Sequence, residues 1–523
     1  MSKLYPVGIQ NFEKLRKDGY CYIDKTDLIY RLVTTGQYYF LGRPRRFGKS
    51  LLISTIEAYF QGKKDLFNGL AAGSLEKEWR QYPVLHFDLN AKKFDDTDDL
   101  YCLLDRQLLE YERVYGSEAD DGSLEGRFIK LIRTAVEKTG LNAVVLIDEY
   151  DKPLLQAIGN IGLQNAYRDT LKAFYSVLKS ADGYIRFAFL TGVTKFWKVS
   201  IFSDLNNLED ISMNPCYSSL CGITDAEIRE YFQDEVEYLA KANRQSIEDT
   251  YAKLKDSYDG YHFCEDVPGV YNPFSLLVTL KNGKYGSYWF ETGTPTYLVE
   301  LLKRNRYNLE KMSSMLTSAA VINGLDSPYG NPIAVIYQSG YLTIKGYDRD
   351  LRLYRLGFPN REVEEGFMNF LLPYYTDTTE DQGPYQIGMF VREVRAGDID
   401  SFMERLQSLM ADTPYEIVKD LENHYQNVIF IITELLGFYV NAEYHTSNGR
   451  IDLVIKTPDY IYVMEFKFNG TAEDALRQID EKGYALPFAK DRREVYRIGV
   501  NFSGESRNID RWIVSKGAGK QEL

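Results

Sequence analysis

The sequence predicts an α/β protein that begins with a helix-covered parallel sheet and ends in a separate αβββαβ unit. In the first two hundred residues strand signals alternate with helix signals, a pattern typical of βαβ units. The run Ala143–Ile147 is continuously apolar and rich in β-branched residues, as expected for a central strand covered on both faces. Near the C-terminus, Asn448-Gly449 separates two strand-like runs, which favours a hairpin.

Residues 1–204 are predicted to form the first domain, with a parallel-sheet core. Apolar residues recur at helical spacing directly after the first strand-like run, which indicates that a helix follows it. The expected strands are Gln37–Leu41, Pro83–Leu89, Ala143–Ile147 and Arg186–Leu190. The expected helices are Ser50–Phe60, Asp98–Tyr115, Leu124–Thr139 and Asn165–Ser180.

Residues 205–384 are predicted to form a mainly helical lid and middle region, whose periodicity does not settle its fold. Thr224 and Glu227 stand at the spacing of a capping box, which predicts a helix from there to about Ala242. Turn-rich aromatic stretches follow that helix in the sequence.

Residues 385–523 are predicted to form the C-terminal domain. A helix over Pro414–Leu436 is expected to end at Gly437, because glycine commonly follows the last turn of a helix. The remaining elements are expected as strands, a helix and a last strand over Phe438–His445, Arg450–Lys456, Asp459–Phe468, Ala472–Gly483 and Val495–Asn501. Their order is αβββαβ.

Charge and hydropathy restrict the class of protein. The net charge of −13 over 523 residues opposes non-specific binding to a polyanion, so any surface for nucleic acid must be local. The most apolar run, Val428–Val440, is interrupted by Thr433 and Glu434, and nothing in the sequence is expected to span a bilayer. The N-terminus lacks the apolar core of a signal peptide. We therefore expect a cytoplasmic protein without a membrane partner.

The five cysteines are odd in number and scattered, unlike the disulfide framework of a secreted domain. Cys216 and Cys221 could be read as half of a zinc site, but no histidine lies near them at ligand spacing. We expect buried free thiols instead.

A phosphate-binding loop is predicted between the first strand and the helix that follows it, over Gly42–Ser50. Backbone N–H groups of such a loop and of the helix N-terminus cradle phosphate oxygens. Lys49 would reach the β- and γ-phosphates of ATP, and the Ser50 hydroxyl would ligate Mg²⁺. Five residues separate Gly42 from Gly48 instead of the usual four, so Arg43 occupies the position of the first glycine. A basic turn before an amphipathic helix is the alternative interpretation.

A second motif favours the nucleotide interpretation. The apolar strand Ala143–Ile147 leads directly into Asp148 and Glu149. Asp148 would hold the metal, and Glu149 would polarise an attacking water. Thr191, at the end of the next strand, would sense the γ-phosphate, although a plain strand end explains it equally well.

The remaining polar residues of this domain have weaker assignments. Arg46 and its neighbour Arg45 would contact phosphates or a neighbouring subunit, or would be solvated charges of the loop. Asp24 or Thr26 would only cap the helix that follows them.

A carboxylate site is predicted in the C-terminal domain. Glu465 and Lys467 alternate along one strand and point to the same face, and Asp452 lies beside them if the hairpin has the expected register. Two carboxylates provide oxygen ligands for Mg²⁺ or Mn²⁺, and Lys467 could orient a water or stabilise charge on a phosphate. Glu422 on the preceding helix and Gln478 on the following helix are candidate accessory residues. The alternative is a solvated face with cross-strand ion pairs, which the apolar neighbours of Glu465 disfavour.

The sequence resembles the bacterial AAA-ATPase-like family whose members carry a C-terminal PD-(D/E)XK nuclease-like domain. The resemblance rests on the following segments: Tyr22–Thr26, Arg43–Ser50, Ile147–Asp151, Leu190–Lys195, Tyr271–Pro273, and Asp452 with Glu465-x-Lys467. It covers almost the whole chain, and the same variant of the phosphate loop is found in the family. It implies a P-loop ATPase core and a restriction-endonuclease-like C-terminal domain. The Pro-Asp pair of the nuclease motif is absent, since Ile451 precedes Asp452.

These observations favour an ATPase whose nucleotide state controls a metal-dependent nuclease. ATP and Mg²⁺ are the expected cofactors, with Mn²⁺ as a substitute at the nuclease site. DNA is favoured over RNA as the substrate. The competing hypothesis is a nucleotide-switched regulatory or binding protein with a silent nuclease-like domain, and a third is a scaffold that uses ATP for assembly. Whether the chain forms a homo-oligomer stays open.

Overall fold

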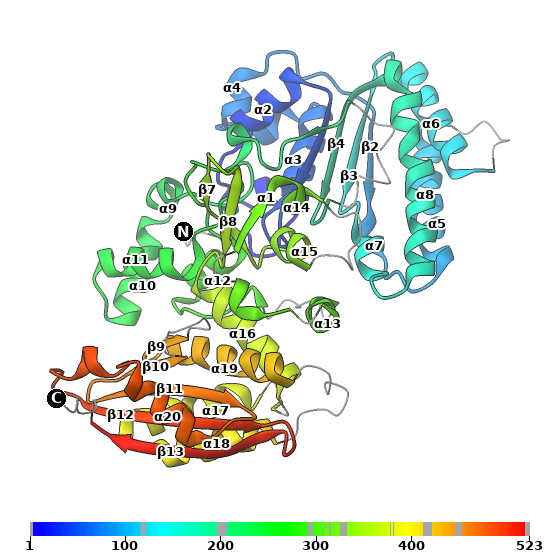
Figure 1. Cartoon of the computed structure of the whole chain (residues 1–523). Helices are drawn as coiled ribbons and strands as arrows, with labels where there is room; N and C mark the ends of the chain where they lie inside the picture. The colour runs from blue at the N-terminus through cyan, green and yellow to red at the C-terminus, as the bar shows by residue number, and fades with distance from the viewer. Residues whose placement is uncertain are drawn as a thin grey trace. The chain divides into compact units, whose positions relative to one another are not determined.

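The computed structural model shows the chain as two compact units (Figure 1). It describes residues 4–116, 122–195, 207–290, 297–305, 307–312, 315–324, 332–376, 378–379, 381–411, 421–444 and 452–517. Unit 1 comprises Met1–Leu301 and Ser314–Val363, and unit 2 comprises Leu302–Ser313 and Glu364–Leu523. Most of the predicted middle region, 205–384, therefore belongs to unit 1. The domain boundaries after 204 and 384 stay predictions.

The core of unit 1 is a five-stranded sheet. Its strands are β1 (Tyr38–Gly42), β2 (Val84–Asp88), β3 (Ala143–Asp148), β4 (Ile185–Gly192) and β5 (Glu209–Asp210). Their order is β2-β3-β4-β1-β5, and every neighbouring pair is parallel. The predicted parallel sheet is confirmed. Because parallel strands share one direction, the C-terminal ends of β1, β3 and β4 lie at one edge of the sheet.

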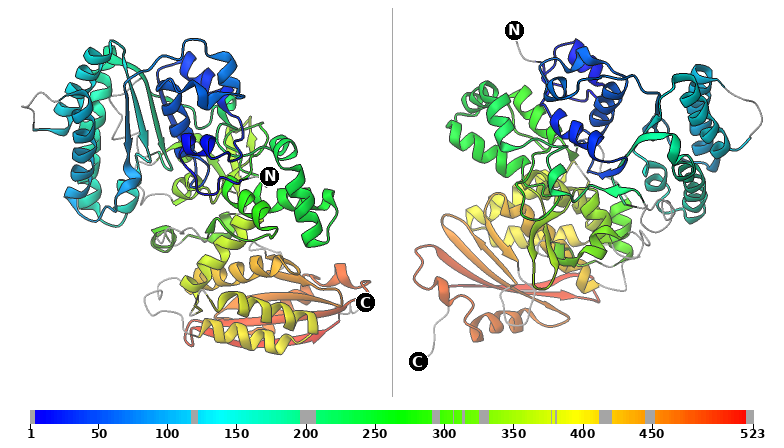
Figure 2. Two further views of the ribbon diagram at one scale, coloured as in Figure 1. Left: turned by 180° about the vertical axis from the view of Figure 1, so that it is seen from behind. Right: turned by 90° about the horizontal axis from the view of Figure 1, so that it is seen from above.

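Helices cover both faces of this sheet (Figures 1 and 2). On one face lie α5 (Thr97–Tyr115), α6 (Leu124–Thr139) and α8 (Ile161–Ser180); on the other lie α2 (Thr26–Thr35), α3 (Lys49–Phe60) and α4 (Ala71–Leu75). The long helices begin at side-chain caps, such as Ser123 for α6 and Asn160 for α8, which satisfy N–H groups that have no partner within the helix. Phe128 of α6 and Phe174 of α8 stack with ring centroids 4.5 Å apart.

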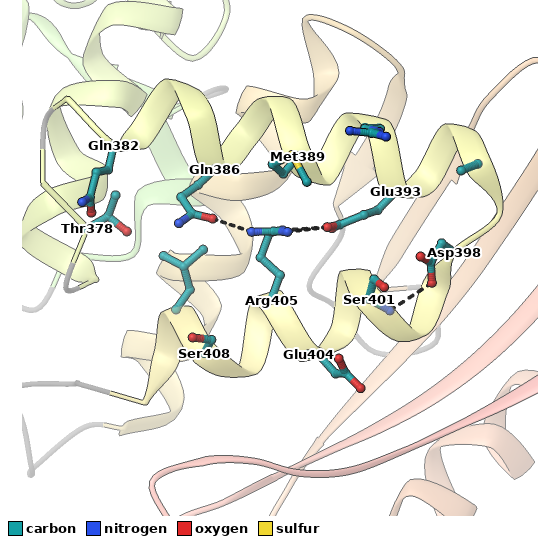
Figure 3. Close-up of a pocket in the computed structure, with 13 residues that line it drawn as sticks. Thr378, Gln382, Gln386, Met389, Glu393, Asp398, Ser401, Glu404, Arg405 and Ser408 are labelled. Carbon is teal, nitrogen blue, oxygen red and sulfur yellow. Dashed lines mark hydrogen bonds and ion pairs between the residues drawn. The ribbon is translucent and has the colours of Figure 1, made fainter.

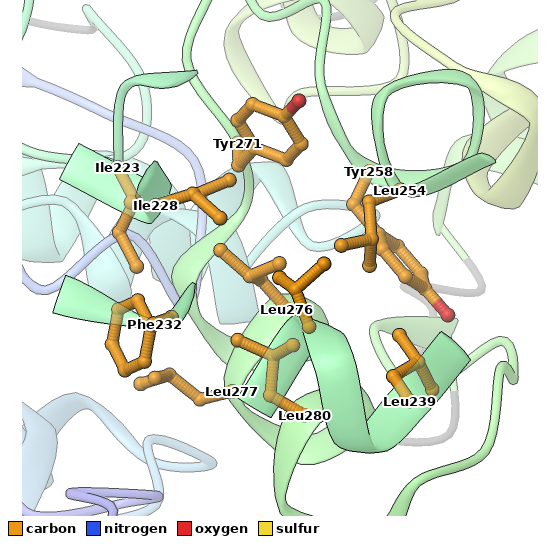
Figure 4. Packing of buried hydrophobic residues seen from close by; sticks show 11 residues of the cluster. Ile223, Ile228, Phe232, Leu239, Leu254, Tyr258, Tyr271, Leu276, Leu277 and Leu280 are labelled. Atoms are coloured by element: carbon orange, nitrogen blue, oxygen red, sulfur yellow. The ribbon is translucent and has the colours of Figure 1, made fainter. Parts of the chain in front are cut away.

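The helix expected from Thr224 to Ala242 is two helices, α9 (Asp225–Tyr231) and α10 (Gln233–Asn243). The capping box of Thr224 and Glu227 begins α9 as expected. At Phe232 the backbone leaves the helical region, and the side chain is fully buried in an apolar cluster with α11 (Ile247–Tyr258) and α12 (Pro273–Asn282) (Figure 4). Burial of that ring fixes the break, which local periodicity does not reveal.

The middle region also contains a small antiparallel sheet that the sequence analysis did not predict. Its strands are β6 (Met315–Ser318), β7 (Thr343–Asp348) and β8 (Leu353–Gly357), in the order β6-β8-β7. The short helices α14 (Ala319–Asn323) and α15 (Pro332–Gln338) lie between β6 and β7 in the sequence. The helix α13 covers Tyr297–Arg304.

Unit 2 contains the predicted αβββαβ order, which is confirmed. The elements are α19 (Leu421–Gly437), β9 (Asn441–Tyr444), β10 (Leu453–Lys456), β11 (Tyr460–Phe468), α20 (Ala472–Glu481) and β12 (Glu494–Ser503). A further strand, β13 (Asn508–Lys516), and the helices α16 (Arg361–Tyr375), α17 (Gly383–Ala396) and α18 (Ile399–Met410) were not expected. The sheet order is β13-β12-β11-β10-β9, and β11 and β12 are parallel. The predicted turn at Asn448-Gly449, Ile451 and the expected helix start at Pro414 lie outside the described residues.

Alternate residues of β11 face different helices, as the period of a strand requires. The hydroxyl of Tyr462 donates to the carbonyl oxygen of Val394 in α17 at 2.8 Å. Val463 packs in a buried cluster with Ile479 of α20. Glu465 and Lys467 therefore share the face of the sheet that carries α20.

Two expectations about composition can be compared with the structure. Cys221 and Cys264 are buried free thiols, but Cys102 and Cys216 are exposed and Cys21 is half-buried, so the expectation of buried thiols is wrong for these three. Cys216 lies in a short turn in which only the next residue, Tyr217, is buried. Within the described ranges, no helix combines the length and the apolar character that crossing a bilayer requires.

Candidate functional site

The predicted phosphate loop joins β1 to α3 through two residues in the left-handed region. Arg46 has φ of 66° and Gly48 has φ of 90°, and α3 begins at the next residue, Lys49. A side chain at position 48 would be strained by the backbone conformation even though open space surrounds it. The glycine is therefore required by the backbone conformation at the start of the helix.

The ammonium group of Lys49 is buried beneath this loop. Its side chain is 2% exposed, and Nζ lies 3.0 Å from Oε1 of Glu149. Nζ also donates to the carbonyl oxygens of Arg43 and Pro44 at 3.0 and 3.2 Å. The lysine thus links the loop to the end of β3.

Asp148 and Thr191 meet across the ends of β3 and β4. The Thr191 hydroxyl donates to Oδ1 of Asp148 at 2.6 Å, and both residues are buried. Glu149 follows with φ of 54°, a left-handed conformation that is costly for a residue with a side chain. The structure thus brings together Lys49, Asp148, Glu149 and Thr191, while Ser50 lies half-buried in the first turn of α3.

Part of the predicted phosphate cradle is committed to other contacts. The backbone N–H of Gly42 donates to the Ser212 hydroxyl at 2.8 Å, and that of Arg43 donates to the carbonyl oxygen of Gly192 at 3.1 Å. The backbone donors that remain for a phosphate belong to the later part of the loop, between positions 44 and 50.

Arg43 itself has a structural position. It is 1% exposed, and its guanidinium donates to the carbonyl oxygens of Ser212 and Tyr217 at 2.8 and 3.1 Å. The group also lies over the ring of Phe263, 3.9 Å from its centroid. Nε of Arg43 is buried without a hydrogen-bond partner. The contacts with Ser212, Tyr217 and Phe263 join residues distant in the sequence, so the sequence did not predict this structural position. The predicted contact of Arg43 with the nucleotide stays a prediction.

The structure gives Arg46, Asp24 and Thr26 contacts within the protein, and the predicted phosphate contact of Arg46 stays a prediction. The Arg46 side chain is exposed and lies over the ring of Phe274 at 4.8 Å. Asp24 accepts from the N–H groups of Thr26 and Ala71, each at 2.8 Å. Asp24 and Thr26 hold the starts of α2 and α4, and do not belong to the nucleotide site.

Sequence reasoning gave no role to Asp151, which orders the same edge of the sheet. Its carboxylate is fully buried and accepts from the N–H groups of Val193 and Thr194, the latter at 2.6 Å. Burial, and then the neighbouring Glu149 carboxylate, raises the pKa of Asp151 to about 6. The signal was the third acid of the Ile147–Asp151 segment, whose partners could not be identified without the fold.

The three predicted residues of the C-terminal site lie together on one face of unit 2. Leu453 pairs with Met464, so Asp452, just before β10, stands opposite Glu465. Oδ2 of Asp452 accepts from the N–H of Phe466 at 2.8 Å. Nζ of Lys467 lies 3.2 Å from Oε1 of Glu465.

Gln478 of α20 connects two of these residues. Its Oε1 accepts from Nζ of Lys467 at 2.5 Å, and its Nε2 donates to Oε1 of Glu465. The amide can serve both partners because its oxygen accepts from the cation and its nitrogen donates to the carboxylate. The predicted accessory position of Gln478 is therefore in direct contact with the site.

The electrostatics of the two carboxyl groups, Asp452 and Glu465, suit a divalent cation. Glu465 is 2% exposed, and its Oε2 is buried without a hydrogen-bond partner. Burial, and then the charge of Asp452, raises the pKa of Glu465 to about 7; burial raises the pKa of Asp452 to about 6. A bound cation would favour both ionised forms and provide the partner that Oε2 lacks.

The described residues contain no group of three or more His, Cys, Asp or Glu side chains that could hold a metal ion. Glu422 is exposed on α19, and it does not complete such a group with Asp452 and Glu465. The pair fits Mg²⁺, which commonly binds through one or two carboxylates and keeps several waters.

A separate groove of about 790 Å³ lies between α17 and α18 (Figure 3). Arg405 crosses it, donating to Oε1 of Glu393 at 2.6 Å and to Oε1 of Gln386 at 2.9 Å. None of the residues that line it belongs to the Asp452–Glu465–Lys467 site.

A parallel sheet with a glycine-lysine loop after its first strand and acids at the end of β3 defines the P-loop class of nucleotide-binding domain. Unit 2 has the order of elements of a PD-(D/E)XK domain. Family comparisons agree. The model described as "Predicted AAA-ATPase" matches residues 6–202, and that of the PD-(D/E)XK nuclease superfamily matches residues 420–512. The chain belongs to the AAA-ATPase-like family with a C-terminal domain of the PD-(D/E)XK nuclease superfamily.

Two individual proteins are similar to this chain. A protein of Azotobacter chroococcum mcd 1, described as "Uncharacterized protein in vnfD 5'region", is 34% identical over 522 residues, covering 98% of this chain and 99% of the relative. The ORC1 protein of Aeropyrum pernix, solved in complex with DNA, aligns with 66% of this chain and 92% of its own at 10% identity and a TM-score of 0.25. So low a score supports no inference about this chain.

Proposed function

We propose that this protein binds and hydrolyses ATP, and that its nucleotide state controls a magnesium-dependent nuclease that prefers DNA. The observation that carries the proposal is the presence of one acid–lysine pair in each unit. Lys49 lies against Glu149 at the first site, and Lys467 lies against Glu465 at the second. Both arrangements suit phosphate chemistry that needs a cation and a metal-holding acid.

At the first site, each residue has a separate task. Lys49 binds the β- and γ-phosphates, Ser50 and Asp148 hold Mg²⁺, and Glu149 orients and deprotonates the attacking water. Thr191 fixes the carboxylate of Asp148 through its 2.6 Å hydrogen bond. Arg43 holds the start of the loop in place through its hydrogen bonds to Ser212 and Tyr217.

At the second site, Asp452 and Glu465 hold Mg²⁺ or Mn²⁺. The metal, when bound, activates a water and neutralises charge on the scissile phosphate. Lys467 stabilises the same developing charge, and Gln478 holds its ammonium group in place. DNA is proposed on the family resemblance alone, because no described residue distinguishes deoxyribose from ribose.

The experiment measures cleavage of labelled DNA and RNA by the full chain with and without Mg²⁺ and ATP. We expect cleavage of DNA that requires Mg²⁺, and Asp452→Ala should abolish cleavage while leaving ATP binding intact. Lys49→Ala should abolish ATP binding and leave the metal affinity of unit 2 unchanged.

A folded Asp452→Ala protein that cuts as fast as wild type would refute the nuclease assignment. Binding of DNA without cleavage, under all these conditions, would favour a nucleotide-switched binding protein. The net charge of −13 weakens the retention of a polyanion, so it favours a partner other than DNA for such a binding protein.

A further inference from the structure

Two segments at the edge of the unit 1 sheet are joined to each other by hydrogen bonds. They comprise residues 148–151, which begin with the last residue of β3, and residues 191–195, which begin with the last two residues of β4, and we call them the paired turns. The N–H of Tyr150 donates to the carbonyl oxygen of Thr191 at 2.9 Å. The Tyr150 hydroxyl donates to the carbonyl oxygen of Thr194, also at 2.9 Å. Asp151 adds bonds to two further N–H groups of the second turn. A displacement of Glu149 must therefore move the second turn as well.

Lys195 stands at the far end of the paired turns and contacts three elements. It is 4% exposed, and Nζ lies 2.8 Å from Oδ2 of Asp210 in β5. Nζ also donates to Oδ1 of Asn323, at the end of α14, at 2.7 Å, and the backbone N–H donates to Oε1 of Gln338, in α15, at 2.7 Å. Gln338 donates in turn to the carbonyl oxygen of Ile322 at 2.7 Å.

Two of the elements that Lys195 contacts, α14 and α15, belong to one insert in the chain. We call residues 315–357, which contain β6, α14, α15, β7 and β8, the insert. It also touches the phosphate loop, because a Cβ at Gly340 would lie 2.6 Å from Cβ of Pro44. The insert thus contacts the phosphate loop, which carries Lys49, and the paired turns, which carry Asp148, Glu149 and Thr191.

The order of the chain gives the insert a second property. Residues Leu302–Ser313 of unit 2 precede it, and Glu364, where unit 2 resumes, follows it closely. Both chain connections from the insert therefore lead toward unit 2. A shift of the insert changes the end points of those connections.

We infer that Lys195 is a positioning residue that transmits occupancy of the nucleotide site through the paired turns to the insert. The inference rests on the proposed ATP-binding function and names the element that reads it. When a γ-phosphate draws Lys49 away from Glu149, the paired turns relax together, and Lys195 carries α14 and α15 with them. An element can respond to a ligand only if its contacts differ between the two states, and Lys195 supplies such contacts.

Hydrogen exchange of the full chain, with and without a non-hydrolysable ATP analogue and Mg²⁺, tests the inference. In wild type we expect the analogue to slow exchange in residues 44–60 and to change exchange in α14 and α15. Lys195→Met should retain the first effect and lose the second. The matched control is Lys152→Met, since Lys152 lies beside the paired turns but donates to Asn90.

A second variant guards against misfolding. Asn323→Ala removes only the insert's side of the contact at a half-buried position, and it should weaken the exchange response of α14 without changing analogue affinity. Failure of wild type to bind the analogue would refute the proposed function itself. Binding with protection of residues 44–60, but with no response of α14 and α15 in wild type or with a full response in both variants, would refute the inference alone.

Discussion

Nζ of Lys49 lies 3.0 Å from the carboxylate of Glu149 at a site where both side chains are largely buried. The residue proposed to bind phosphate is thus paired with the residue proposed to activate water. A bound phosphate group would compete with this carboxylate for the ammonium group, and the carboxylate would then be free to face the γ-phosphate. Charge-assisted pairs in such surroundings are stronger than pairs in water.

Glu149→Gln should increase the affinity for ATP while slowing its hydrolysis. The amide removes the competing negative charge from Lys49, and we expect the Kd for ATP to fall about three- to tenfold. Loss of the general base should lower kcat about a hundredfold or more. Isothermal calorimetry and a phosphate-release assay measure the two effects. Glu137→Gln, at an exposed position of α6, is the control, and weaker ATP binding by Glu149→Gln would contradict the competition.

Arg43→Lys should destabilise unit 1. A lysine cannot satisfy both carbonyl oxygens that the guanidinium reaches, at Ser212 and Tyr217, and a buried acceptor without a partner is costly. We expect a loss of about 2–4 kcal/mol, seen as a lower midpoint in thermal unfolding followed by calorimetry. Arg45→Lys, at an exposed position of the same loop, should change stability by less than about 0.5 kcal/mol. Equal midpoints for the two variants would refute the structural role.

Gln478→Ala should impair cleavage more than metal binding. Without the amide, Lys467 loses its 2.5 Å partner and its ammonium group falls back on Glu465. We expect kcat to fall about tenfold, with the Mg²⁺ affinity of the full chain, measured by calorimetry, within about threefold of wild type. Glu481→Gln, at an exposed position near the end of the same helix, provides the control. An unchanged kcat would show that the bridge has no role in catalysis.

Glu434 should make unit 2 more stable in mild acid. Burial, followed by the nearby carboxyl group of Glu364, raises its pKa to about 7 from the ordinary 4.5. Between these values the folded protein holds the proton and the unfolded chain does not. The stabilisation is therefore complete below about pH 4.5 and is lost as the pH rises through about 7.

Glu434→Gln, which cannot ionise, should remove this dependence. The comparison is the change in Tm between pH 5 and pH 8 for wild type and variant, with Glu404→Gln at an exposed position of α18 as the control. We expect a smaller fall in Tm for Glu434→Gln than for the other two proteins. The same fall in all three would contradict the raised pKa.

The local sequence pattern was sufficient to predict most of the helices and strands that carry the two sites. Hydrophobic period and turn signals act over a few residues, so β1, α3, β3 and β11 begin and end within three residues of their predicted bounds. The acids Asp148 and Glu149 at the end of β3 and the glycine-lysine pair at the start of α3 were recognisable as candidates because of their residue types and their position at strand ends. The order of parallel strands then forces such residues to one edge.

Contacts between distant residues were beyond the reach of the sequence. Only folding brings together the partners of three contacts: Arg43 with Tyr217, Asp151 with Thr194, and Gln478 with Lys467. The break of a helix at Phe232 likewise depends on the burial of its ring among other helices. The sequence by itself determined which residues are candidates for the chemistry and on which elements they stand. The tertiary structure decided which charged groups face a ligand and which hold the scaffold, because a buried polar group must find its partner wherever the fold supplies one.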